Sequence, residues 1–300
     1  MSETFPRTTA QLKAALAEVG IHPKRQHGQH FLTDVQAMDA IARDADLKPG
    51  DVAIEVGTGP GLLTHVLAES GATVVSYDID PEIQAFARCL RTWPDTVRFE
   101  LLDVLAAKTR LADRFAAAFA ERPTPPGRLM LVSNLPYNAG TPILLGVLSL
   151  PTPPDRIVVM VQEEVGEKML AAAGDGAYGV PSVAVGLKAE GRILRRFGPQ
   201  VFWPRPKVRS VVLELVPRRP APLEPTEHAP FGTFVTAVFT RRRKVLPTAL
   251  KAAMPGLTAE EAKAAMADLG LAPTVRADAV APEVFLALWR ALGGAEGSVR

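Results

Sequence analysis

The chain has 300 residues, 47% of them hydrophobic and 22% charged, as expected of a folded globular protein with more than one core. Its net charge of +2 neither requires nor excludes nucleic acid as a partner. No apolar run is long enough to cross a bilayer, and the polar start is not typical of a signal peptide. The single cysteine, Cys89, allows no internal disulfide and is expected to pack in the amphipathic stretch Pro81–Leu90. We therefore expect a cytoplasmic protein that does not bind membranes; we also expect a monomer.

The start of the chain is predicted to be a loosely attached arm with a short helix, Thr9–Val19. The next segment, Pro23–Leu32, has neither a helical nor a strand period; it is basic, rich in amides and ends in two apolar residues. We expect this segment to lie across a site. His27 and His30 could suggest a metal, but no carboxylate or thiol stands at ligand spacing with them, so no metal site is expected. Asp34 can cap the helix predicted next.

A strand, a glycine-rich turn and the start of a helix are predicted within residues 51–64. Glycines at every second position, Gly57, Gly59 and Gly61, let the backbone approach a ligand closely and turn sharply into a helix N-terminus. The next predicted strand ends at Asp78, twenty-one positions after Gly57. This βαβ spacing predicts a carboxylate where the ribose hydroxyls of a bound nucleoside would lie.

The identity of the nucleoside depends on the details of the turn. The third glycine comes one residue too early for the dinucleotide pattern G-x-G-x-x-G. Glu55, just before the turn, also fits poorly beside a pyrophosphate, whereas it suits the ammonium or sulfonium end of S-adenosylmethionine. These features favour S-adenosylmethionine over a dinucleotide as the cofactor. A tight turn in an α/β sheet without any ligand is the remaining alternative.

Three further buried strands are predicted, within residues 97–102, 129–132 and 157–161. The first ends at Asp103, whose carboxylate would lie near the amino group of an adenine ring; a helix-capping role is the alternative. Polar residues follow four of the predicted strands. Because the carboxyl ends of strands in an open α/β sheet form its ligand-binding edge, we expect these residues to converge on one crevice.

The run Asn134-Leu135-Pro136-Tyr137 follows the strand at 129–132. Asn134 offers a side-chain oxygen, and Leu135, held extended by Pro136, directs its backbone carbonyl outward. Two such acceptors suit a planar amino group that must lose its resonance before it can attack. Tyr137 adds a face on which a base can stack. An ordinary turn is the alternative, because Asn and Pro are common in turns.

A stiff extended loop is predicted at Phe202-Trp-Pro204-Arg-Pro206, because alternating prolines restrict the backbone. Such a loop can hold Phe202 above the crevice, opposite Tyr137. An edge loop with a core phenylalanine is the alternative. A strand, Val211–Val216, is predicted after it.

The proline-rich stretch 217–227 is predicted to link an α/β domain, residues 1–220, to a helical domain, residues 228–300. Helical spacing is clear in Phe231–Arg243, and a capping box and Pro282 begin two later helices. Basic side chains are dense on both sides of the linker. Because they border the proposed base-binding loop, we expect them to bind the phosphates of RNA. These residues are Arg205, Lys207, Arg241, Arg242, Arg243 and Lys244.

These motifs occur in the same order in a known family. The chain resembles the KsgA-type (RsmA) small-subunit ribosomal RNA adenine dimethyltransferases from about Lys24 to the last helix. The matching pieces are G-Q-x-F-L at Gly28–Leu32, E-V-G-x-G-x-G-x-L-T, N-L-P-Y, F-x-P-x-P-K-V-x-S and Arg242-Arg-Lys244. The resemblance implies a Rossmann-like methyltransferase sheet followed by a small, all-helical, RNA-binding domain.

The resemblance also implies which residues contact S-adenosylmethionine: His30, Leu32, Gly57, Asp78, Asp103 and Asn134. Four positions differ from the residues usual in the family. His27 replaces an aromatic residue, His30 an asparagine, Asp78 a glutamate and Glu163 a lysine.

The activity implied by the resemblance is dimethylation of the 6-amino group of two adjacent adenosines near the 3′ end of small-subunit (16S) rRNA, with a role in small-subunit biogenesis. The residues alone argue only for methylation of the amine of a base. One alternative is a large-subunit adenine methyltransferase of the antibiotic-resistance type, which shares the N-terminal motifs; Arg242-Arg-Lys244 and the run at 275–278 favour the small-subunit type. Another is a ribosome-assembly or RNA-binding factor that keeps the fold but not the catalysis.

Overall fold

The computed structural model describes residues 5–24 and 28–294, and the chain divides into two compact units. The first unit comprises Met1–Gly166 and Arg192–Pro217, and the second comprises Glu167–Gly191 and Arg218–Arg300. Residues 167–191 thus precede the proline-rich stretch but group with the helices that follow it. The predicted domain limits, 1–220 and 228–300, stay a prediction.

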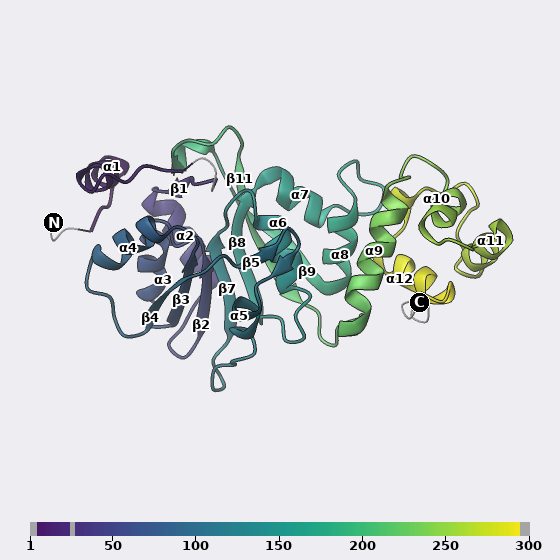
Figure 1. The fold of residues 1–300 in the computed structure, drawn as a ribbon, viewed down its shortest axis with the longest axis horizontal. Coiled ribbons are helices and arrows are strands. Elements are labelled where there is room, and N and C mark those ends of the chain that lie inside the picture. Colours follow the sequence, from purple (N-terminus) through teal and green to yellow (C-terminus); the bar gives the residue numbers. More distant parts are fainter. Residues whose placement is uncertain (1–4, 25–27, 295–300) are drawn as a thin grey trace. The chain divides into compact units, whose positions relative to one another are not determined.

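A seven-stranded mixed sheet, in the order β4-β3-β2-β7-β8-β11-β9, organises the first unit (Figure 1). The β11 strand (Ser210–Pro217) pairs antiparallel with β8, and β9 (Ala189–Phe197) lies at the edge. This arrangement confirms the predicted Rossmann-like α/β fold class. The five strands that run parallel are β2 (Val52–Val56), β3 (Thr73–Asp78), β4 (Val97–Leu101), β7 (Leu129–Asn134) and β8 (Arg156–Gln162).

Both faces of the central strands are covered. Met130 and Met160 on one face join the core that includes α2 (Val35–Ala45), α3 (Leu62–Ala68) and α4 (Pro81–Cys89). Successive residues of a strand point to opposite faces, and the strand neighbours of Met130 and Met160 are equally buried on the other face. Burial on both faces explains why these strands are apolar throughout. The short α5 (Asp113–Ala117) and α6 (Gly140–Val147) lie on the other face (Figure 1).

The N-terminal arm is more firmly attached than predicted. Its helix α1 (Thr9–Glu18) starts at a capping box of Thr8 and Gln11, and its Leu12 and Leu16 are fully buried in the core of the first unit. After the arm, β1 (Phe31–Leu32) pairs antiparallel with β10 (Phe202–Trp203) in the proline-containing loop. The expectation of a loosely attached arm was therefore wrong, because the arm brings its own apolar face and a strand.

Cys89 is exposed, so the expectation that it packs was also wrong. The buried face of α4 consists of Ile83, Gln84, Phe86 and Ala87. Cys89 is the last residue of the helix and is not part of this face.

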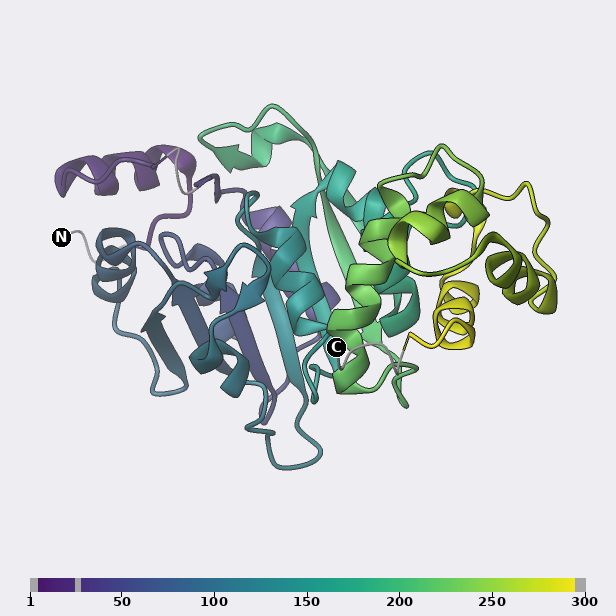
Figure 2. The ribbon, with the colours of Figure 1, turned by 45° about the vertical axis from the view of Figure 1, so that its right-hand side comes forward.

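The second unit is helical (Figure 2). It has its own apolar core, which includes Phe231, Leu250 and Trp289. The predicted capping box is present: Thr258 Oγ1 accepts from the amide of Glu261, whose carboxylate accepts from the amide of Thr258. Within the described residues, no helix has both the length and the hydropathy needed to cross a membrane. The helices of this unit include α8 (Val180–Lys188), α9 (His228–Phe239), α10 (Leu246–Ala253), α11 (Ala259–Asp268) and α12 (Pro282–Ala291).

Candidate active site

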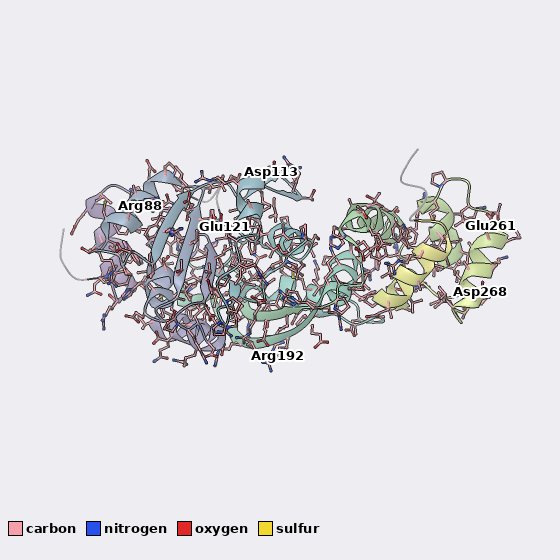
Figure 3. All side chains as sticks on the ribbon, turned by 90° about the horizontal axis from the view of Figure 1, so that it is seen from below. Arg88, Asp113, Glu121, Arg192, Glu261 and Asp268 are labelled. Atoms are coloured by element: carbon pink, nitrogen blue, oxygen red, sulfur yellow. The ribbon has the colours of Figure 1, made fainter. Side chains whose placement is uncertain are left out.

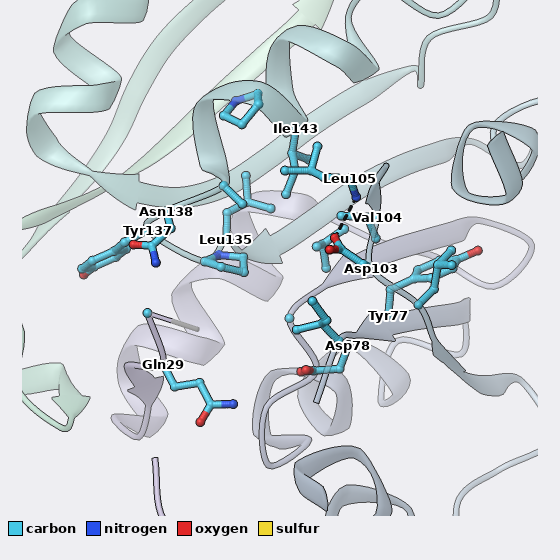
Figure 4. Close-up of a pocket in the computed structure, with 18 of the residues that line it drawn as sticks. Gln29, Tyr77, Asp78, Asp103, Val104, Leu105, Leu135, Tyr137, Asn138 and Ile143 are labelled. Carbon is cyan, nitrogen blue, oxygen red and sulfur yellow. Dashed lines mark hydrogen bonds between the residues drawn. The ribbon is translucent and has the colours of Figure 1, made fainter. Parts of the chain in front are cut away.

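A cavity of about 840 Å³ opens at the carboxyl edge of the parallel strands in the first unit. Asp78 and Asp103 lie on one side of it, and Tyr137 and Asn138 lie on the opposite side (Figure 4). The strands deliver these residues together because parallel strands end at the same edge of a sheet. The predicted site residues that line the cavity are His30, Gly57, Gly59, Asp78, Asp103, Asn134, Leu135, Pro136 and Tyr137.

The glycine loop between β2 and α3 is shaped for close packing. Gly57 and Gly59 have positive φ angles, 87° and 51°, which glycine adopts without strain. A Cβ on Gly59 would come within 3.1 Å of the Phe31 ring, and one on Gly57 within 3.4 Å of Pro136. The loop therefore brings the arm and the Asn134–Tyr137 run close to the ends of the strands.

The amides of this loop are already used within the protein. Those of Gly57 and Thr58 donate to the Tyr77 carbonyl at 2.7 and 3.1 Å, and that of Gly59 donates to the Asp78 carboxylate at 2.8 Å. The amide of Gly61 donates to the Thr58 carbonyl at 2.9 Å, and the proline at position 60 has no N–H. Residues 57–61 thus present no amide donor to a pyrophosphate, which argues against a dinucleotide.

Asp78 ends β3 and is 8% exposed. Its Oδ2 accepts from the Gly59 amide and its Oδ1 accepts from the Asp80 amide, at 2.8 and 2.9 Å. Burial raises the pKa of Asp78, and these two hydrogen bonds oppose that rise. Each carboxylate oxygen has two lone pairs, so Asp78 can hold the loop and also accept from the hydroxyls of a ribose.

Glu55 lies behind the loop rather than on the cavity wall. Its side chain is fully buried, and its Oε2 accepts from Thr64 Oγ1 and Ser76 Oγ, both at 2.6 Å. Burial raises the pKa of Glu55 from 4.5 to about 7. Glu55 therefore joins α3 to β3 beneath the loop.

Asp103 is exposed and sits in the turn after β4, where its Oδ1 accepts from the Leu105 amide at 2.9 Å (Figure 4). The chain then forms a small hairpin, β5 (Leu105–Ala107) and β6 (Arg110–Leu111), and residues 104–108 also line the cavity. Sequence patterns did not predict this wall, because an alanine-rich stretch shows neither alternation nor helical spacing.

Asn134 is the last residue of β7, and its side chain is held in one orientation. Its Nδ2 donates to the His30 carbonyl at 3.4 Å. Only the amide nitrogen can donate to a carbonyl, so this bond identifies the other atom as the oxygen. That oxygen, Asn134 Oδ1, is buried and has no hydrogen-bond partner among the described residues. A buried acceptor without a partner is rare and costs free energy, which marks it as a candidate functional atom.

The next three residues leave the sheet. The Leu135 amide donates to the Met160 carbonyl at 3.1 Å, and the Leu135 side chain is buried. The carbonyl of Pro136 accepts from the amides of Ala139 and Gly140, both at 3.0 Å, and so leads the chain into α6. These hydrogen bonds fix the backbone on both sides of the Leu135–Pro136 bond.

Tyr137 is held at its hydroxyl and against two rings. Its Oη lies 2.7 Å from Ser210 Oγ, and burial raises its pKa. The His30 ring is centred 5.3 Å away, and the Phe202 ring lies at 6.1 Å with the two planes inclined at 73°. Tyr137 and Phe202 thus meet edge to face, not as parallel plates, and Phe202 is buried against the arm. A base held between these two rings would have to separate them.

His30 occupies the position where the resembling family usually has asparagine. Its Nδ1 lies 2.7 Å from the Pro204 carbonyl, which accepts, so Nδ1 carries a proton. Leu32 is buried in β1 opposite Phe202 and does not line the cavity. His27 lies outside the described residues.

Comparison with known proteins identifies the chain's relatives. A family model described as ribosomal RNA adenine dimethylase matches residues 21–292. The chain belongs to this family. The sequence-based resemblance and the expectation of an enzyme, an rRNA adenine methyltransferase, are therefore confirmed.

Relatives named ribosomal RNA small subunit methyltransferase A match nearly the whole chain. The one from Streptomyces griseus is 36% identical over 299 residues, covering 96% of this chain and 97% of its own length. The one from Phenylobacterium zucineum is 38% identical over 288 residues, covering 95% and 92%.

Solved structures share the fold. A dimethyladenosine transferase from Plasmodium falciparum has a TM-score of 0.71 at 22% identity and covers 88% of this chain and 98% of its own. The 23S rRNA methyltransferase ErmE has a TM-score of 0.61 at 25% identity and covers 88% and 99%.

The basic residues predicted to bind RNA are all exposed. Arg205 and Lys207 lie in the loop between β10 and β11 of the first unit. In the second unit, α9 ends at Phe239, whereas helical spacing was predicted through Arg243, and Arg241–Lys244 form a turn. We call Arg241–Lys244 the basic turn. Within it, Arg242 donates to the Gly176 carbonyl at 3.4 Å and lies 3.7 Å from Asp278.

Glu163, where the resembling family often has lysine, begins α7 (Glu163–Leu170). Its carboxylate lies 3.0 Å from Arg196 and 3.4 Å from Arg209. Other arginines of β9 are also paired with acids, among them Arg192 (Figure 3). The side chain of Arg192 is 70% exposed and bonds to Glu214. Glu163 therefore does not add an isolated negative charge to this part of the first unit.

Proposed function

We propose that this protein uses S-adenosylmethionine to dimethylate the 6-amino group of two adjacent adenosines near the 3′ end of small-subunit rRNA, as part of small-subunit biogenesis. Membership in the ribosomal RNA adenine dimethylase family supports the reaction. The names of the relatives from Streptomyces griseus and Phenylobacterium zucineum support the small subunit as the substrate.

The residues around the cavity fit S-adenosylmethionine. Family membership implies this chemistry. The backbone amides of residues 57–61 donate to acceptors within the protein, so the cavity favours a ligand without a pyrophosphate. Asp78 would accept from the ribose hydroxyls, and Asp103 would accept from the amino group of the adenine. His30 and Gly57 would line the same space. When bound, the cofactor supplies a methyl group on a sulfonium.

The observation that carries the proposal is the unpartnered oxygen of Asn134 at the cavity. The 6-amino group of adenine is a poor nucleophile while its lone pair feeds the ring. Acceptance of its hydrogens by Asn134 Oδ1 and the Leu135 carbonyl favours a pyramidal nitrogen, whose lone pair is free to attack. Because these bonds are better in the transition state than in the ground state, they accelerate transfer and do more than bind substrate.

The rest of the chain's contribution is positioning. Tyr137 offers a ring against which the extruded base can lie, and its bond to Ser210 keeps that ring in place. The rigid backbone of residues 134–136 fixes the two acceptors relative to the cofactor pocket, and holding reactants in register lowers the barrier further. Arg205, Lys207 and the basic turn would bind phosphates of the rRNA and carry no sequence information themselves.

The test is methyl transfer from labelled S-adenosylmethionine onto purified ribosomal subunits. The subunits come from cells that lack this protein, so that the target adenosines are unmodified. The expected product is dimethyladenosine at two adjacent positions near the 3′ end of the small-subunit rRNA. Methylation of large-subunit rRNA would point instead to the activity named for ErmE, and binding to subunits without methyl transfer would point to an assembly factor.

A further inference from the structure

The carboxylate of Asp80 joins the N-terminal arm to the end of β3. Asp80 Oδ1 accepts from Lys24 Nζ and Asp80 Oδ2 accepts from Gln29 Nε2, both at 2.9 Å. Asp80 is 1% exposed. Burial raises its pKa, but the hydrogen bonds from Lys24, Gln29 and the Glu82 amide, together with the charge of Lys24, hold the pKa below its ordinary value. Asp80 is therefore ionised at neutral pH, and both bonds are charge-assisted.

Each side of this connection leads to the cavity. Gln29 lines the cavity together with Gly28, His30 and Phe31 (Figure 4). On the other side, the amide of Asp80 donates to Asp78 Oδ1 at 2.9 Å, and the Gly59 amide bonds to the other oxygen of Asp78. The arm, Asp80, Asp78 and the glycine loop thus form one continuous network of hydrogen bonds, and Asp80 itself lies outside the cavity wall.

Helix capping accounts for only part of this arrangement. Asp80 is the N-cap of α4, where its Oδ1 also accepts from the Glu82 amide at 3.1 Å. A cap needs one side-chain oxygen, which asparagine, serine or threonine can supply as well. The second oxygen faces Gln29, and burying a full negative charge is unfavourable unless it is paired. The pairing therefore holds the arm as well as capping the helix.

We infer that Asp80 is a positioning residue for the cofactor. Acting through Gln29 and Lys24, it holds residues 28–31 against the cavity and thereby sets the affinity for S-adenosylmethionine. The inference rests on the proposed function, because it takes S-adenosylmethionine as the ligand of this cavity. Its effect is on cofactor binding and not on the methyl-transfer step, because Asp80 touches neither Asn134 nor Tyr137.

The informative variant is Asp80→Asn, because asparagine keeps the helix cap and the shape but removes the charge and one acceptor. We expect the Kd and the KM for S-adenosylmethionine to rise about tenfold, the effect of removing one hydrogen bond to a charged group, with kcat at saturating cofactor unchanged. Glu82→Gln is the matched control. It removes the negative charge of Glu82, whose exposed carboxylate lies 2.6 Å from Lys24 Nζ, and leaves the hydrogen bonds of Asp80 in place, so the Kd should not change.

A double-variant cycle tests whether Asp80 acts through Gln29. If it does, Asp80→Asn combined with Gln29→Ala weakens binding by less than the product of the two single effects. Independent effects that multiply would overturn this route.

The measurements separate the inference from the proposed function. Calorimetry on the wild-type protein comes first, and absence of S-adenosylmethionine binding there would defeat the proposed function. Binding in the wild type with an equal Kd in Asp80→Asn overturns the inference alone. A loss of kcat at saturating cofactor that parallels a lower unfolding midpoint also overturns it, because a general structural role would then explain the defect.

Discussion

The cavity of the first unit and the basic turn of the second hold their functional side chains in opposite ways. At the cavity, Asp78 is buried and bonded to the glycine loop, and Asn134 is bonded to the backbone of the arm. In the basic turn, all four side chains are exposed, and the Arg242 side chain lies 3.4 Å from the Gly176 carbonyl and 3.7 Å from Asp278. The difference matches the two tasks. An amine must be held at fixed distances from two acceptors, whereas a phosphate responds to nearby charge. The effects of substitutions at the cavity should therefore not depend on salt concentration. Substitutions in the basic turn should change how strongly RNA binding depends on salt concentration.

The largest effect is expected at Asn134. Asn134→Ala removes one of the two proposed acceptors, and such a group is worth roughly 2.7–4 kcal/mol by analogy with an oxyanion-hole donor. Turnover should fall about a hundredfold or more at any salt concentration, with little change in RNA affinity. Methyl transfer at saturating substrates measures this.

Asn138→Ala is the control for that variant. Asn138 is a second amide on the cavity wall, and it packs against Gly28. Its removal should reduce turnover far less. Near-normal turnover in Asn134→Ala would remove Asn134 from the catalytic assignment.

Glu55 should make the stability of the first unit depend on pH. Burial raises its pKa to about 7 from 4.5, so between these values the native protein holds a proton that the unfolded chain has released. The free energy of unfolding therefore falls as pH rises through this range, by up to about 3 kcal/mol. Glu55→Gln keeps an acceptor for Thr64 and Ser76 but cannot ionise.

Denaturant unfolding at pH 5 and pH 8 tests this expectation. The wild type should lose stability between the two values, and Glu55→Gln should lose less. The exposed Glu82→Gln is the control and should behave like the wild type. A pH profile that is the same in Glu55→Gln and the wild type would mean that Glu55 does not titrate in this range.

Asp78→Ala should weaken the binding of S-adenosylmethionine by about 1.5–3 kcal/mol, the contribution of hydrogen bonds to a charged group. The same change also removes the acceptor of the Gly59 amide, so the loop is weakened together with the grip on the ribose. Asp103→Ala should cost less, because Asp103 is exposed and water competes for its oxygens. Calorimetry on the two variants shows which of them loses more affinity for S-adenosylmethionine. Unchanged affinity in Asp78→Ala would exclude Asp78 from the site.

Sequence patterns predicted the parts of this structure that short-range rules determine. The strands β2, β3, β7 and β8 were found because buried parallel strands are apolar throughout, and the glycine loop was found from its spacing. The residues at the ends of these strands could be assigned to one cavity, because the fold class determines where parallel strands end.

The missed features depend on interactions between distant segments or on weak local patterns. The pairing of β1 with β10 joins residues far apart in the chain. Each strand has only two residues, which is too short for a periodic pattern to predict it. The edge strand β9 was missed because its exposed residues are mostly charged, which hides the alternation. Nothing in the sequence distinguishes Asp80 from an ordinary helix cap, and only its hydrogen bonds with Lys24 and Gln29 reveal a second role.

The smallest effect is expected in the basic turn. Arg242 and Arg243 are exposed, so their contribution to RNA binding acts through counterion release. Neutralising both should flatten the log–log salt dependence by up to about one unit for each phosphate that the variant no longer binds. Binding of S-adenosylmethionine should stay as in the wild type. The measurement is binding to small subunits across a salt series.

A charge-matched control separates direct phosphate binding from net charge. Lys251 in α10 and Lys263 in α11 are also exposed and belong to the same unit, so neutralising this pair removes the same charge elsewhere. If the basic turn binds phosphates, the salt dependence should flatten more in the Arg242 and Arg243 variant than in the lysine variant. Equal flattening would mean that only the overall charge of the unit matters. An unchanged slope in both would locate the RNA-binding residues elsewhere. Arg205 and Lys207 would be the next residues to neutralise, because they lie in the loop whose Pro204 carbonyl accepts from His30 at the cavity.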